Sequence, residues 1–81
     1  MPLFIVRATF DEDAKVWVVS ESDIPGLATE AHSFDELRKK LVVMIPELLD
    51  ANGWPEWVPA SGEVPVGIIA HASERIRREA A

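Results

Sequence analysis

The chain has 81 residues, which is enough for one small domain and too few for two. It contains no cysteine and two histidines, a composition that excludes disulfides and thiolate metal sites and disfavours a histidine-based metal site. Fourteen acidic residues outnumber eight basic ones, and the net charge of −6 disfavours tight binding to a phosphate backbone and suits a basic partner protein.

The first twenty residues predict a β-hairpin. Residues 3–10 and 15–20 are rich in aromatic and β-branched side chains, and the acidic segment 11–14 between them is a short polar turn. A connection this short joins antiparallel strands. Both strands carry apolar side chains on both of their alternating faces. A loop with a tight bend at Pro25-Gly26 follows, and residues 27–31 predict a short third strand near a sheet edge.

The next element is a helix that begins with a capping box. The Ser33 hydroxyl can accept from the backbone N–H of Glu36, whose carboxylate can reach back. Asn52-Gly53 predicts the end of the helix, with Gly53 in a left-handed conformation. Pro46 interrupts the helix interior, and we expect a kink there rather than the start of a second helix. The apolar positions recur at helical spacing: Leu37, Leu41, Met44, Ile45 and Leu48.

The C-terminal third predicts an irregular connector over residues 54–62 and a last strand over residues 63–72. Residues 73–81 form a short tail, compatible with either a short helix or a frayed end. The expected fold is therefore an α+β domain, residues 1–72, of order β-β-β-α-β. We expect an antiparallel sheet with one helix packed on one face.

Apolar side chains on both faces of the hairpin favour self-association, because one helix can cover only one face of a small sheet. A homo-oligomer is the expected form, with Phe4, Val6, Trp54 and Trp57 as candidate interface residues. The alternative is that residues 54–58 fold back and cover the second face. No apolar run is long enough to cross a membrane, and residues 1–4 do not resemble a secretion signal, so we expect a cytoplasmic protein.

The stretch 6–53 resembles the HicB-like antitoxin family, specifically its small single-domain branch without a DNA-binding extension. The features that carry the resemblance are the acidic hairpin turn, the strand around Trp17, the capped helix and these runs: Asp23-Ile24-Pro25-Gly26-Leu27, Thr29-Glu30-Ala31 and Ile45-Pro46-Glu47-Leu48-Leu49. The resemblance implies a fold like a partly degraded RNase H sheet. It also implies pairing with a small basic RNA-cleaving toxin of the HicA type.

We expect Trp17, Asp23 and Glu30 to lie near the partner surface. Residues 1–32 hold two basic side chains against six acidic ones, a balance that could steer a basic toxin and compete with its RNA. DNA binding is not expected of this chain alone. Three alternatives stay open: a solitary homo-oligomeric protein without a toxin, a small RNA-binding protein, and a residual nuclease.

Catalysis is not expected, and neither is a cofactor or a metal. Asp11, Glu12 and Asp13 fit a solvated turn better than a metal site, which would need oxygens from other segments. His71 could act as a general base, but its spacing reveals no serine, cysteine or carboxylate partner, so we expect a half-packed residue at a strand end. The arginines of the tail alternate with glutamates, which favours a solvated segment.

Overall fold

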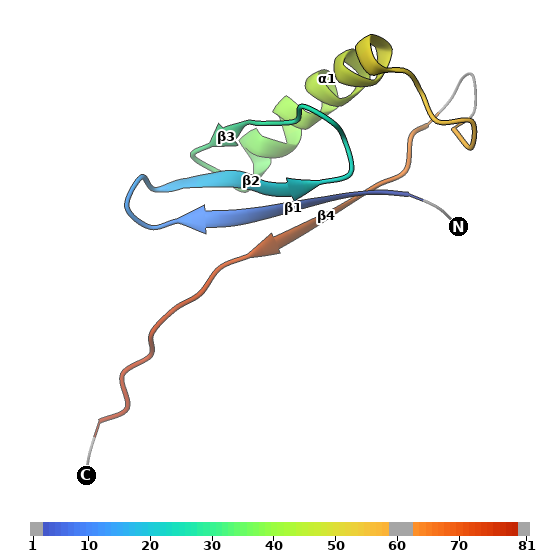
Figure 1. Ribbon diagram of the computed structural model, residues 1–81. Helices are drawn as coiled ribbons and strands as arrows, with labels where there is room; N and C mark the ends of the chain where they lie inside the picture. Colours follow the sequence, from blue (N-terminus) through green and yellow to red (C-terminus); the bar gives the residue numbers. More distant parts are fainter. Residues whose placement is uncertain (1–2, 59–62, 80–81) are drawn as a thin grey trace.

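The computed structural model describes residues 3–58 and 63–79 (Figure 1). Its elements follow the predicted order and confirm the α+β fold class. They are β1 (Phe4–Asp11), β2 (Val16–Ser22), β3 (Glu30–Ala31), α1 (Phe34–Asn52) and β4 (Val66–His71). The third strand is shorter than expected: Glu30 and Ala31 pair with β2, whereas Leu27 precedes this pairing and is buried in the core. The tail, residues 73–79, has no regular structure and is not helical.

The four strands form one sheet in the order β3-β2-β1-β4. β1 pairs antiparallel with β2, and β2 pairs antiparallel with β3, but β4 pairs parallel with β1. The expectation of an antiparallel sheet is therefore wrong for β4, and the sheet is mixed. The physical reason is the crossover: α1 carries the chain back along the sheet, so β4 runs in the same direction as β3 and β1.

The acidic turn between β1 and β2 is closed by its own first residue. The Asp11 carboxylate accepts hydrogen bonds from the backbone N–H groups of Asp13 (2.9 Å) and Ala14 (3.2 Å). Lys15 closes the turn with a positive φ of 59° and donates its N–H to the Asp11 carbonyl. The Asp11 side chain, at the last position of β1, thus stabilises the turn that follows it.

The predicted helix start is confirmed, because the Ser33 hydroxyl accepts from the Glu36 N–H at 3.1 Å. α1 then runs as one helix through Pro46, so no second helix begins there. Gly53 ends it with a positive φ of 98°, as expected, but its ψ of 134° lies outside the left-handed helical region. The Gly53 N–H donates to the Leu49 carbonyl at 2.8 Å.

The core lies between α1 and one face of the sheet (Figure 1). On the helix, one stripe of four leucines and isoleucines is buried; on β1, alternate residues are buried. The buried core residues of these two elements are Leu37, Leu41, Ile45, Leu49, Phe4, Val6 and Ala8. Burial of one helix stripe and one strand set is what the 3.6-residue and 2-residue periods of these elements dictate.

The segment after α1 packs on the helix side of the sheet. The Trp57 ring lies 4.8 Å from the Phe4 ring, and Val58 packs against the core. The Trp54 indole N–H donates to the Asp50 carboxylate at 2.6 Å. The alternative that residues 54–58 cover the second face of the sheet is therefore wrong.

Candidate binding surface

The sheet face opposite α1 is the candidate binding surface. Cross-strand partners share a face, so the pairings Arg7 with Glu21 and Ile69, and Thr9 with Val18 and His71, identify this side. We call it the open sheet face and define it by Leu3, Ile5, Arg7, Thr9, Val18, Glu21, Glu30, Gly67, Ile69 and His71. None of the described helices or strands lies over it (Figure 1).

One end of the open sheet face is an apolar patch around Gly67. A Cβ atom placed at Gly67 would lie 2.9 Å from a tip carbon of Leu3 and 3.2 Å from one of Ile5, so both side chains lie over this glycine. Leu3 and Ile69 are 43% and 42% exposed. Because Gly67 has no side chain, Leu3 and Ile5 can lie flat against β4 at this position. The apolar patch that these two side chains form with Ile69 remains in contact with water.

The middle of the open sheet face is polar and ordered by side-chain pairs. The Arg7 guanidinium lies 3.4 Å from the Glu21 carboxylate, and the hydroxyls of Thr9 and Ser20 are 3.1 Å apart. The pairing register shifts between Arg7 and Ala8, which marks a β-bulge opposite these residues. An exposed ion pair of this kind adds little stability, so its value lies in orienting charge on the surface.

An acidic rim surrounds the open sheet face on the β2–β3 side and at the hairpin end. All six acidic residues of the first 32 are exposed, and we call them the acidic rim: Asp11, Glu12, Asp13, Glu21, Asp23 and Glu30. Among the described residues, four cations lie near the face: Arg7, which is paired with Glu21, Lys15 in the hairpin turn, Lys40, which donates to the Glu30 carbonyl, and Arg75 beyond β4. The six acidic side chains of the rim outnumber Arg7, Lys15 and Lys40, so this side of the molecule has a net negative charge.

The three residues predicted for a partner surface do not lie together. Glu30 is opposite Val18 and belongs to the open sheet face. Trp17 lies on the helix side, half-buried, with its ring 5.3 Å from that of Phe10 and 5.7 Å from that of Phe34. The Asp23 carboxylate accepts from the Ile5 N–H at 2.8 Å and holds the end of β2 against the start of β1.

The predicted oligomer interface needs a correction. The side chains of Phe4 and Val6 are 5% and 0% exposed, because alternate residues of β1 face α1 and these two belong to the covered set. They are core residues and offer no surface to a second copy. Trp54 and Trp57 are 38% and 41% exposed, at the C-terminal end of α1 and not on the open sheet face.

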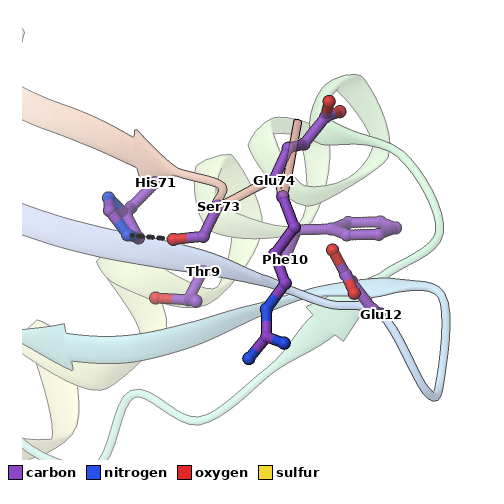
Figure 2. A pocket seen from close by; sticks show the side chains of 7 residues that line it. Thr9, Phe10, Glu12, His71, Ser73 and Glu74 are labelled. Carbon is purple, nitrogen blue, oxygen red and sulfur yellow. Dashed lines mark hydrogen bonds between the residues drawn. The ribbon is translucent and has the colours of Figure 1, made fainter. Parts of the chain in front are cut away.

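A pocket of about 570 Å³ lies at the hairpin end, between β1 and the start of the tail (Figure 2). Its lining mixes charges and hydroxyls: Thr9, Phe10, Glu12, His71, Ser73, Glu74 and Arg75. His71 Nε2 and the Ser73 hydroxyl are 3.1 Å apart, so His71 does have a serine partner, which the spacing analysis missed. His71 is exposed rather than half-packed.

The pair of His71 and Ser73 is exposed and lies at the C-terminal end of β4. In a catalytic triad a third group orients the imidazole, and among the described residues no carboxylate accepts a hydrogen bond from His71. Within residues 3–58 and 63–79, no group of three or more histidines, aspartates or glutamates could hold a metal ion. No helix in the described part of the chain is long and apolar enough to cross a membrane.

Comparison with known proteins identifies a matching family and a similar solved structure. The family model of DUF1902, a domain of unknown function, matches residues 3–80. The crystal structure of the hypothetical protein TTHA1013 from the extremely thermophilic bacterium Thermus thermophilus is similar, with 42% sequence identity and a TM-score of 0.64. The match covers 95% of this chain and 100% of that one. No curated protein matches this chain.

Proposed function

The chain belongs to the DUF1902 family of small domains, and on this premise we propose that it is a protein-binding module of the HicB-like antitoxin type. In this proposal the open sheet face binds a small basic RNA-cleaving toxin and neutralises it. The observation that carries the proposal is the combination of an uncovered apolar patch, Leu3, Ile5 and Ile69, with an acidic rim on the same side of the molecule.

The two parts of this surface have different roles in binding. Burial of the apolar patch would supply affinity, since stable interfaces need a desolvated centre. The acidic rim would raise the rate of encounter with a cationic protein and repel RNA, which binds to the same cationic surface of a toxin. A partner of matching chemistry therefore has an apolar centre surrounded by lysines and arginines.

The residues that carry the family resemblance also support the proposal, because they position part of the open sheet face. Gly26 has a positive φ of 80°, and Ile24 and Leu27 on either side of the Pro25-Gly26 bend are buried in the core. This bend brings the chain from β2 to β3 and so places Glu30 beside Val18. The motif from Asp23 to Leu27, which carries part of the resemblance, thus positions one border of the open sheet face.

A binding experiment with two matched variants tests the proposal. The chain would be co-expressed with a small basic protein encoded by an adjacent gene, and the purified complex assayed for RNA cleavage. Ile69→Lys places a cation on the apolar patch and should abolish both complex formation and inhibition. Val43→Lys is the control, because Val43 is 58% exposed on α1, away from the open sheet face. Absence of a complex, or equal loss in both variants, would contradict the proposal.

The acidic rim is tested by the rate of association. Glu21→Gln with Glu30→Gln removes two charges from the rim, and we expect the association rate constant to fall about tenfold at low ionic strength. The rate should also become less sensitive to salt. Glu47→Gln with Glu56→Gln removes the same charge from exposed positions outside the rim and should change the rate much less. Stopped-flow measurements at several salt concentrations decide between these outcomes.

A further inference from the structure

The two edges of the sheet are protected to very different extents. β3 has two paired residues, so it offers almost no edge for a further strand. β4 has six, Val66–His71, and none of them is charged. Among the described residues only β1 pairs with β4, so its outer edge is unpaired. Long edges without a charge, a proline or a bulge readily add another strand.

A groove lies directly above this edge, between α1 and β4. It has a volume of about 380 Å³ and is lined by Arg38 and seven apolar residues: Leu41, Val42, Ile45, Pro46, Val64, Val66 and Ile68. Val42 is 74% exposed in the groove wall. An apolar groove beside an unpaired strand edge can take an extended segment that carries one apolar side chain.

The chain has such a segment in its own tail. Residues 72–79, which we call the arm, continue the line of β4 away from the rest of the molecule (Figure 1) and are exposed throughout. The extents of the molecule, 61 × 26 × 18 Å, reflect this projection. Ile76 is the apolar residue of the arm and is 87% exposed.

We propose that the arm of a second copy binds in the groove and along the free edge of β4, reciprocally, so that the chain forms a twofold dimer. β4 and the arm form one extended segment, and two such segments can pair antiparallel about an axis near Ala72. Ile76 of one copy then lies opposite Ile68 of the other, on the face that borders the groove. The open sheet face stays uncovered, so this inference does not depend on the proposed function.

Net charge favours the encounter of two copies, whereas the position of the arm follows from the groove and the strand edge, because the charged residue of the groove lining, Arg38, is itself a cation. Residues 1–72 carry five basic and twelve acidic side chains, a net of −7, whereas residues 73–81 carry three basic and two acidic ones, a net of +1; together these give the −6 of the whole chain. A cationic arm is therefore attracted to the anionic body of a neighbour.

The arm is poorly suited to bind in its own groove. Its own Ile76 would lie opposite Ile68 only if the chain reversed direction around Ala72, within residues 70–74. That stretch, Ala-His-Ala-Ser-Glu, lacks the glycine, asparagine or aspartate that tight hairpins favour. Exchange between two copies needs no such turn, because the arm continues in the extended conformation.

Cysteine exchange tests the pairing directly, since the natural chain contains no cysteine. Ile68→Cys and Ile76→Cys chains would be mixed and oxidised, and we expect a mixed disulfide dimer because directly opposite residues lie within disulfide range. Ile76→Cys mixed with Val43→Cys should give little product. A disulfide that forms only within one chain of the double variant Ile68→Cys/Ile76→Cys would overturn the proposal and show a folded-back arm.

Light scattering supplies the second test. The wild-type chain should have twice the 9.0 kDa mass of one copy. Ile76→Asp and Val42→Asp should both be monomers with unchanged circular dichroism, because both side chains are exposed in the single chain. Glu21→Gln with Glu30→Gln, on β2 and β3 and away from the edge of β4, should remain a dimer, which separates a failure of this inference from a failure of the proposed function. A wild-type monomer at millimolar concentration, or a dimeric Ile76→Asp variant, would contradict the inference.

Discussion

The two faces of the sheet have similar sequences and opposite roles. On β1, Phe4, Val6 and Ala8 are buried under α1, whereas Leu3 is exposed and Ile5 half-buried on the open sheet face. The covered face is buried because α1 lies on it. It is not more apolar than the open sheet face at the start of β1, where both faces carry apolar side chains. The comparison teaches that apolar side chains on both sides of a strand indicate two packing surfaces, of which the single chain fills one.

The largest expected effect is on the covered face. Leu37 is fully buried, and Leu37→Ala should lower the free energy of unfolding by about 2–5 kcal/mol through lost burial and a residual cavity. A domain of this size has little stability in reserve, so the variant should be largely unfolded in urea concentrations that wild type tolerates. Urea titration followed by circular dichroism measures the change. Val43→Ala, an exposed helix substitution, should stay within about 0.5 kcal/mol of wild type.

Trp57 lies at the border of the covered face and should have a smaller effect. Trp57→Ala removes the contact with the Phe4 ring, and we expect a loss of about 1–2 kcal/mol because the indole is only partly buried. Thermal unfolding followed by circular dichroism is the measurement. A loss below the error of the method would mean that the segment after α1 does not cover the core at Phe4.

The helix cap supports the covered face indirectly. Ser33→Ala removes the hydroxyl that accepts from the Glu36 N–H, and should lower stability by about 1 kcal/mol. Ser33→Asp restores an acceptor and should recover most of the loss. If both variants behave like wild type, the start of α1 does not depend on this hydrogen bond.

The smallest expected effect on stability is on the open sheet face. Ile69→Thr keeps a β-branched side chain on the half-exposed strand, so we expect a change within about 0.5 kcal/mol in the isolated chain at low concentration. Chemical denaturation at several protein concentrations measures it. If Ile69→Thr lowered the free energy of unfolding as much as Leu37→Ala, the two faces would not differ in burial, and Ile69 would be buried in solution.

Most of the local structure could be predicted from the sequence, because it depends on neighbours in the chain. The cap at Ser33, the helix end at Gly53 and the turn at Asp11 each rest on hydrogen bonds over two to four residues. The prediction failed for β4, whose direction depends on the crossover through α1. It also failed for His71, because its partner Ser73 became evident only from the position of both side chains in the pocket at the hairpin end.

The candidate site was predicted less well than the fold. The sequence placed a partner surface at Trp17, Asp23 and Glu30, and the structure assigns only Glu30 to the open sheet face. Trp17 packs on the helix side, and Asp23 binds the backbone of Ile5. An alternating apolar pattern does not show which of its two sides contacts a helix. Periodicity alone therefore could not separate residues of the helix side from residues of the open sheet face.

The sequence by itself determined the number, order and type of the elements, the helix boundaries and the acidic character of the first 32 residues. Those properties follow from side-chain periodicity, capping and charge, which act over short distances along the chain. Only the tertiary structure decided that Phe4 and Val6 are core residues, that Ile69 is on an uncovered face and that β4 has a free edge. These depend on where α1 lies against the sheet, and that position results from the packing of residues far apart in the sequence.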